Sequence, residues 1–372
     1  SGDEPDGVEQ DTATDTAGAT SATESKDAGS NDKGNQGKYG LGISGDVSLN
    51  RITDNTRAYI NDAGTFQADR IALTATSNTD IRSFSGAVFF SSEDKSVGLA
   101  GSWSEITLTG ATEAWITAAT LQQVNGLSIA ANRTGDIFSI TAGGSGAPAK
   151  GSVTVAGSVS INRIANSTAA SLDDVNGTIN GDIVLSASDG SELSAIAGAV
   201  SFGGKAGIGA AVALNSINNA TAATISGSIL SQTGLLTLEA ASDATIESIT
   251  SSAGLSQNNA GVAGTVSINE ISNTVEASVT ATQQAAGVPL SAGAISLSAR
   301  DGTTIRAISG AVGVSKNIGF GAAVSYNAVN NTVSAHVDSS SIDTTGSLSL
   351  AAESTSLIET ITVGVAGGKS LG

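Results

Sequence analysis

The sequence contains no cysteine, no methionine and only one histidine among its 372 residues. Without cysteine the chain has no disulfide, no thiolate nucleophile and no Cys-ligated metal, which is compatible with an exported bacterial protein. The single histidine, His336, lies on the predicted outward side of a strand, so we expect it at the surface. A catalytic triad with a histidine base is therefore disfavoured.

Positive charge and long apolar runs are also scarce. Sixteen Lys and Arg stand against 34 Asp and Glu, which gives a net charge of −18 and a pI near 4.2. Nucleic-acid binding requires clustered Lys and Arg, so no nucleic-acid partner is expected. No long uninterrupted apolar run is present, so we expect no transmembrane helix, and no signal peptide is visible at the start.

Residues 1–38 contain almost no large apolar side chain and are rich in Asp, Glu, Ser, Thr and Gly. Such a segment cannot offset its ordering entropy by burial, so we predict a flexible acidic linker. The rest of the chain, residues 39–372, is predicted to be one repeat domain. The lack of methionine, and an end at GGKSLG where another strand would begin, lead us to expect a piece of a longer array.

Glycine is abundant, with 46 residues, and much of it recurs at fixed positions. The stretch 207–225, GIGAAVALNSINNATAATI, has close variants at 40–60, 151–172, 261–279 and 319–337, and a degenerate sixth copy at 98–116. The copies align on an asparagine and predict a repeat of roughly 53 to 58 residues. The aligned residues are Asn50, Asn162, Asn215, Asn269 and Asn327, whereas the degenerate copy has Ile106.

Within each copy, large apolar residues alternate with small ones. A period of two over this length predicts a strand with one buried face. We expect the large residues, such as Ile208, Val212 and Leu214, to be buried. The small residues that alternate with them, such as Gly207 and Gly209, should face outward. On the same side of the strand as the large residues, one position holds a small residue in every copy. We expect a large side chain of an opposing sheet to fill the gap that these small residues leave. They are Gly45, Gly101, Gly157, Ala210, Gly264 and Ala322.

Four strand-like runs in each repeat predict an all-β fold, an elongated repeat β-solenoid of the parallel β-helix type with repeats of about 55 residues. Rungs of roughly 20 to 30 residues would place two coils in each repeat. The alternative is a local antiparallel hairpin between the fourth run and the next first run, and the two arrangements can coexist. Polar pairs such as Asn218-Asn219 predict a corner or tight turn after the first run.

The repeated signature is V-x-x-N-x-I-x-N-x-x-x-A-x-I, followed by G-x-[IL]-x-L-x-A and an AGA-type strand. It resembles the repeats of very large bacterial surface proteins of the leukotoxin-like filamentous adhesin type, related in style to filamentous haemagglutinin. The resemblance covers about residues 39–371. It implies a secreted or surface-held β-solenoid that reaches out from the cell, and it implies no catalytic residue because the motif is structural.

Two sets of residues are candidate binding sites. Tyr59 and Trp115 occupy equivalent outward positions of adjacent repeats, where aromatic faces can stack on sugar rings or on partner side chains. The alternative is that another segment covers them. The stretch DDVNGTINGD offers oxygens to a hard cation such as calcium, but it lacks the spacing and the final bidentate Glu of a calcium loop, so a simple polar loop is the favoured explanation. Its candidate ligands are Asp173, Asp174, Asn176 and Asp182.

Three functions compete. A structural or adhesive stalk segment of an extracellular or cell-surface protein is favoured, because every recurring residue serves folding. Its partners would be neighbouring repeats of the same parent chain, host or matrix glycans, or other cells. A carbohydrate-binding module would use Tyr59 and Trp115. A solenoid polysaccharide-degrading enzyme is disfavoured, because the acidic residues are scattered singly and do not recur between repeats, so we expect no catalytic activity.

Overall fold

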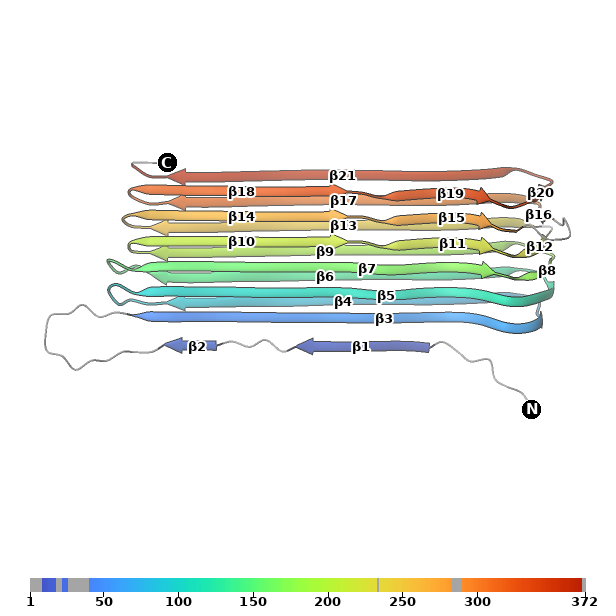
Figure 1. The fold of residues 1–372 in the computed structure, drawn as a ribbon, viewed down its shortest axis with the longest axis horizontal. Coiled ribbons are helices and arrows are strands. Elements are labelled where there is room, and N and C mark those ends of the chain that lie inside the picture. Colours follow the sequence, from blue (N-terminus) through green and yellow to red (C-terminus); the bar gives the residue numbers. More distant parts are fainter. Residues whose placement is uncertain (1–8, 18–21, 26–39, 233, 283–288, 370–372) are drawn as a thin grey trace.

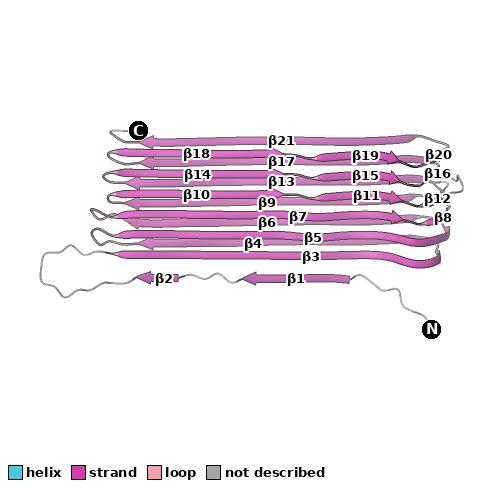
Figure 2. Ribbon diagram, in the orientation of Figure 1, coloured by secondary structure: helices cyan, strands magenta, loops and turns pink. Residues whose placement is uncertain are grey.

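The chain folds into β-strands joined by turns, as Figure 1 shows. The computed structural model describes residues 9–17, 22–25, 40–232, 234–282 and 289–369. Within these ranges no residue is helical (Figure 2), so no helix is present that could cross a membrane. The prediction of an all-β chain is confirmed.

One of the two layers, sheet B, contains six parallel strands in the order β21-β17-β13-β9-β6-β4. Each comes from a different repeat and is about 20 residues long. Their bounds are β4 (Ile71–Phe90), β6 (Leu127–Ala147), β9 (Ile183–Gly203), β13 (Leu235–Ser256), β17 (Ala294–Val314) and β21 (Leu348–Gly367).

The other layer, sheet A, is built from the first half of every repeat. In three repeats this half is one continuous strand, namely β3 (Leu41–Gln67), β5 (Val97–Val124) and β7 (Val153–Asp173). In the other three it is divided into β10 (Ala206–Ile217) and β11 (Ala220–Ser226), β14 (Ala260–Ile271) and β15 (Thr274–Thr280), and β18 (Ile318–Val329) and β19 (Thr332–Asp338). The breaks fall at the predicted polar pairs, but the predicted corner or tight turn is wrong, because β10 and β11 both pair with the continuous β7 in the same sheet. Short strands complete the sheet: β8 (Asn176–Ile179), β12 (Ile229–Gln232), β16 (Leu290–Ala292) and β20 (Ile342–Thr344).

Parts of the predicted acidic linker also belong to sheet A. Strands β1 (Glu9–Ala17) and β2 (Ala22–Ser25) pair antiparallel with β3 at the edge of the sheet. The remainder of 1–38 lies outside the described residues. The flexible-linker interpretation therefore stays a prediction.

The repeats stack with one full repeat between paired residues. Asn162 pairs with Asn215, which pairs with Asn269, so equivalent positions lie side by side on adjacent strands. The expected two coils per repeat are wrong, because the runs merge pairwise into one long strand in each sheet. The alternative of an antiparallel hairpin between the fourth run and the next first run is also wrong, because the link at Gly203–Lys205 joins β9 in sheet B to β10 in sheet A. Long parallel strands in two sheets are consistent with a β-helix or solenoid-like fold.

At one end of the sheets, which we call the wide end, large apolar side chains fill the interior. Ile225 and Leu172 of sheet A and Leu185 and Leu238 of sheet B are fully buried in one cluster. Each stacks on its equivalent in the neighbouring repeats, which gives continuous aliphatic columns. In sheet A these buried residues alternate with the outward column of Tyr59, Trp115 and His336, as a period of two predicts.

At the opposite end, which we call the narrow end, the prediction for the first run is wrong, because its small residues face the interior and its large residues face outward. The interior there holds small residues such as Ala156, Ala199 and Ala211, while the large residues lie on the outer face. The cause is the close approach of the two backbones. An ideal Cβ added to Gly209 would lie 2.4 Å from the carbonyl oxygen of Ala253 in the opposite sheet. The interior at this end therefore holds mainly glycine and small side chains such as alanine, serine and threonine.

The column of small residues from Gly45 to Ala322 lies on the same side of the strands as the large residues, so it also faces outward. A Cβ at Gly45, Gly101 or Gly264 meets nothing within 4 Å, and one at Gly157 meets only the Ala210 carbonyl oxygen at 4.0 Å. The expectation that an opposing large side chain fills these positions is wrong. The column forms the floor of an external groove instead.

We expect Gly209→Ala to destabilise the chain by about 1 to 3 kcal/mol or more, because its methyl group would force the sheets apart. The matched control is Gly264→Ala, whose methyl group enters open space and whose effect should be neutral or stabilising by up to about 1 kcal/mol. Chemical denaturation of the purified variants measures both. Equal destabilisation by the two substitutions would contradict the assignment of inner and outer faces.

The aligned asparagines form a ladder of side-chain amides between the sheets. Nδ2 of Asn162 donates to Oδ1 of Asn215 at 2.9 Å, Asn215 donates to Asn269 at 2.8 Å, and Asn269 donates to Asn327 at 2.8 Å. Asn162, Asn215 and Asn269 are at most 2% exposed. These asparagines are on the side of the strand that was expected to face outward. Their burial explains why the repeat requires asparagine here, since a buried amide must find partners for its donor and its acceptor alike.

Ile106 interrupts this ladder. It occupies the same position of β5, pairs with both Asn50 and Asn162, and is fully buried. Because isoleucine donates no hydrogen bond, the buried Oδ1 of Asn162 has no hydrogen-bond partner. The degenerate copy thus divides the amides into an isolated Asn50 and a continuous series that begins at Asn162.

We expect Asn215→Ala to lower the free energy of unfolding by about 1 to 3 kcal/mol, because the buried Oδ1 of Asn269 would lose its donor. Asn218→Ala is the matched control, since Asn218 is exposed and lies three residues away. Urea denaturation followed by circular dichroism compares the two variants. An effect of Asn218→Ala as large as that of Asn215→Ala would rule out the ladder as the source of stability.

Candidate functional site

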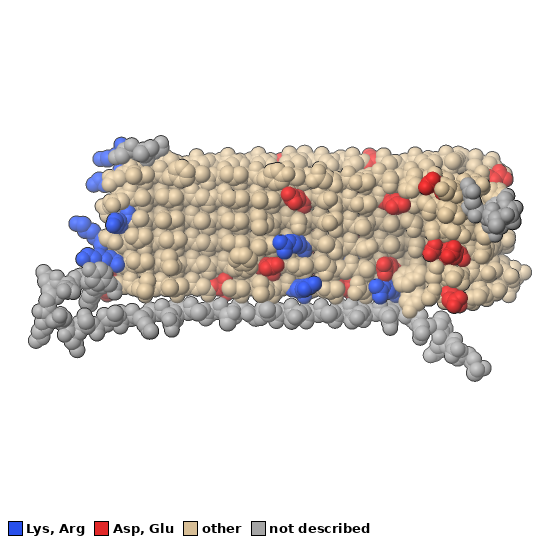
Figure 3. Space-filling view, viewed as in Figure 1, with Lys and Arg blue, Asp and Glu red and all other residues tan. Residues whose placement is uncertain are grey.

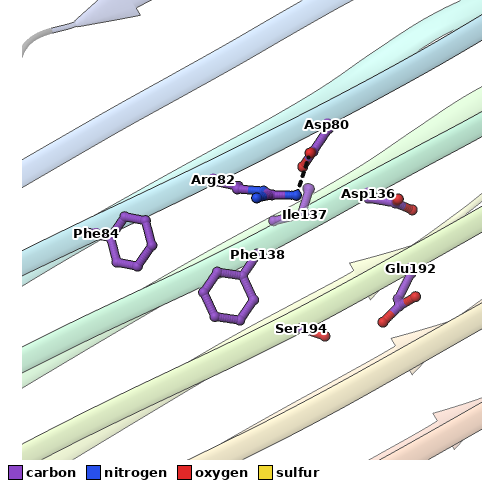
Figure 4. A pocket seen from close by; sticks show the side chains of 8 residues that line it. All are labelled: Asp80, Arg82, Phe84, Asp136, Ile137, Phe138, Glu192 and Ser194. Carbon is purple, nitrogen blue, oxygen red and sulfur yellow. Dashed lines mark ion pairs between the residues drawn. The ribbon is translucent and has the colours of Figure 1, made fainter.

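A charged pocket of about 320 Å³ lies on the outer face of sheet B (Figure 4). Three carboxylates from successive repeats stack in register there: Asp80 on β4, Asp136 on β6 and Glu192 on β9. Arg82 pairs with Asp80 at 3.0 Å. The expectation that acidic residues do not recur between repeats is wrong at this place, and the signal was the constant spacing of 56 residues from Asp80 to Asp136 and from Asp136 to Glu192.

Like charges on adjacent strands perturb the middle carboxyl group. Partial burial raises the pKa of Asp136, and the neighbouring negative charge of Asp80 raises it further. Arg82 acts in the opposite direction but less strongly. The pocket therefore favours a ligand that brings positive charge or hydrogen-bond donors to the carboxylates.

Two aromatic rings border the same pocket. Phe84 and Phe138 lie on adjacent strands with ring centroids 6.0 Å apart and ring planes tilted by 58°. Phe84 is 66% exposed. An apolar ring beside hydrogen-bond acceptors is an arrangement that suits the apolar and hydroxyl faces of a sugar.

Tyr59 and Trp115 come together as predicted, but in a geometry that limits sugar stacking. Their ring centroids are 4.6 Å apart and their planes differ by 6°, so each ring covers a face of the other. The stack follows the direction in which the strands pair, with Ser171 as the next residue of the column. Only the outer face of each ring is left for a ligand, and the binding role of the pair stays a prediction.

The four candidate calcium ligands lie from the last residue of β7 to the residue before β9. Oδ1 of Asp173 accepts a hydrogen bond from Ser226, and Oδ1 of Asp182 accepts one from the backbone N–H of Leu235 at 2.8 Å. Asp174 and Asn176 are exposed beside them. Throughout the described part of the chain no group of three or more His, Asp or Glu is placed to hold a metal ion. The calcium site stays a prediction, with two of its carboxylates bonded to the next repeat.

His336 lies on the outer face of β19, with a side chain that is 42% exposed and its Nε2 3.8 Å from Oε1 of Glu276. Its predicted surface position is confirmed. It follows Ser278 in the same column as Tyr59 and Trp115.

A buried charged cluster, which the sequence did not indicate, lies between the sheets. Arg133 of β6 is 2% exposed, and its Nη1 donates to the backbone oxygen of Asp54 and to Oγ1 of Thr112, each at 3.3 Å. Burial lowers the pKa of the Arg133 guanidinium, while the charges of Asp189 and Asp54 raise it. Arg133 stands in one column with Asp189. This cluster is enclosed between the sheets, so we regard it as a structural element of the interior.

Asp189 is the most perturbed carboxylate of this cluster. Burial raises its pKa, although hydrogen bonds from Ser191 at 3.0 Å and Thr168 at 3.1 Å act against that rise. Asn219 donates a further hydrogen bond at 2.6 Å. The bonds hold the carboxylate in place without fully replacing the water it loses.

We expect the stabilising contribution of Asp189 to decrease as the pH rises. The folded chain holds this proton more tightly than the unfolded chain, so the contribution is complete below the ordinary pKa of 3.8 and is lost as the pH rises through the raised value. Denaturation at a series of pH values from about 3.5 to 7, with Asp189→Asn beside wild type, measures it. Asp243→Asn, at an exposed position of β13, is the control. Parallel pH profiles for wild type and Asp189→Asn would contradict the expectation.

Comparisons of the chain with protein-family models, with curated proteins and with solved structures give no match.

Proposed function

We propose that residues 39–372 form a β-solenoid segment of a large secreted or cell-surface bacterial protein, with a structural and adhesive role and no catalytic activity. The observation that carries this proposal is the register of the repeats. Equivalent residues of six successive repeats pair along whole strands in both sheets, and the recurring Asn, Gly and aliphatic residues all serve this stacking. A chain built in this way gains surface with every repeat and needs no cleft to do so.

The outer faces support the adhesive part of the proposal. The face seen in Figure 3 is broad and shows few charged residues, and both outer faces carry many exposed large apolar side chains. Exposed apolar area on this scale is typical of surfaces that contact other molecules. Neighbouring repeats of the parent chain and surfaces of other cells are the partners that we propose.

Glycan binding is a second candidate, favoured by the charged pocket on sheet B. There Phe84 and Phe138 lie beside carboxylates that can accept hydrogen bonds from sugar hydroxyls. A glycan array probed with wild type, Phe138→Ala and Trp115→Ala distinguishes this pocket from the Tyr59–Trp115 stack. Loss of binding in only one variant identifies the site, and absence of any glycan bound by wild type removes this candidate.

The proposed function is tested in the cell that produces the parent protein. Surface labelling of intact cells should modify the segment, and cells in which it is deleted should attach less well to a surface or to one another. The purified chain, incubated with polysaccharides, should release no reducing sugar. A strictly cytoplasmic protein, unchanged attachment or release of sugar would each overturn the proposal.

A further inference from the structure

The narrow end of sheet A has an outer face that is almost free of charge, which we call the apolar face. It consists of residues 41, 43, 45, 47 and 49 of β3 and their register partners on β5, β7, β10, β14 and β18. Among these five columns over six strands, Glu105 is the one charged residue. Large side chains on it remain well exposed, with Leu41 at 59%, Phe320 at 56% and Val324 at 57%.

A groove crosses this face along the direction in which the strands stack. Its floor is the column of small residues that begins at Gly45 and ends at Ala322. Two ridges border it, one through Leu99 and Ile208 and one through Trp103 and Val212. The hollow has a volume of about 560 Å³ and is lined mainly by apolar groups.

The face approaches the size of a protein interface. Its five columns span four intervals, about 27 Å along the strands, and its six strands span five intervals, about 24 Å across them, so the face covers roughly 650 Å². The largest apolar patch of an ordinary monomer is about 300 to 600 Å². A standard protein interface takes about 800 Å² from each partner.

We propose that this face is an interface at which two copies of the chain associate face to face. The inference does not depend on the cellular role proposed above. A two-fold axis parallel to the stacking direction reverses the order of the columns, so that a ridge of each copy enters the groove of the other. Ridge and groove are one column apart, which allows both insertions at once.

The net charge of −18 opposes the association of two copies over most of their surface. The apolar face is the region where this repulsion is weakest. On the apolar face the one acidic group, Glu105, is paired with Arg163 at 3.4 Å. This face is therefore a region in which close approach of two copies brings little repulsion and buries much apolar area.

Sedimentation equilibrium of the full chain tests the proposal. Wild type should form a dimer, and Val266→Lys, on the same ridge as Trp103 and Val212, should weaken it by at least about 30-fold because a lysine would be buried without a partner in each copy. Gly101→Leu combined with Gly264→Leu should weaken it as well, because both side chains would fill the groove, and an added Cβ at either position meets no atom within 4 Å. Val200→Lys, at an exposed position on the outer face of sheet B, is the matched control and should leave the dimer intact. Unchanged circular dichroism and melting confirm that each variant is folded.

The competing occupant is a lipid bilayer. The five lysines of the described residues all lie in or beside the turns at the narrow end, where Figure 3 shows a group of positive charges. Flotation with vesicles of phosphatidylcholine, with and without phosphatidylglycerol, separates the two. A wild type that is monomeric up to roughly 100 μM, whether or not it floats with vesicles, would overturn the proposal. Equal weakening of a dimer by Val200→Lys and Val266→Lys would do so too, because it would place the contact elsewhere.

Discussion

In-register parallel pairing is the constraint on which the rest of the structure depends. Because each residue lies beside its equivalent from the next repeat, a residue type that recurs becomes a column one strand spacing apart. Columns of Ile or Val pack favourably, and columns of Asn donate and accept in series. A column of one charge would repel itself, which accounts for the small share of charged residues, 13%.

Most charged residues on the outer faces lie beside an opposite charge or a neutral residue on the adjacent strands. Where like charges are adjacent instead, the pKa of a carboxyl group is raised. Arg306 lies between Glu247 and Glu359 on adjacent strands, at 3.2 and 3.0 Å, and these two carboxylates raise the pKa of its guanidinium. Asp136 lies between Asp80 and Glu192, and its carboxyl group holds a proton more readily than an ordinary aspartate. The charged pocket is therefore an exception to a pattern that the rest of the outer faces obey.

The separation of the sheets decides which half of each alternating run is inside. At the wide end the sheets are far enough apart for leucine and isoleucine, and the outer face is polar. At the narrow end the backbones nearly touch, so glycine, alanine and serine occupy the interior and the large residues lie outside. One continuous strand thus changes the chemical character of both its faces along its length.

Much of the fold was predictable from the sequence, because strands and repeat length depend on local periodicity. The outward positions of Tyr59, Trp115 and His336 were predictable for the same reason. Which residues of the first run face the interior could not be predicted, since Gly207 and Ile208 alternate in the same way whether the sheets are close or distant. Of the sites, the neighbourhood of Tyr59 and Trp115 followed from alignment, but the mutual covering of their rings required coordinates. Arg133 gave no signal, since one buried charge without a recurring partner looks like any exposed arginine.

Each repeat contributes one strand position to each sheet, and this has a mechanical consequence. Each repeat of about 55 residues advances the stack by a single strand spacing of about 4.8 Å, and the long dimension of the described part runs along the strands (Figure 1). A length of 1,000 Å along the stack would take roughly 200 repeats, or on the order of 11,000 residues. Such a chain gains little length along the stacking direction for each residue added, but it forms a broad sheet surface whose width is set by the long strands.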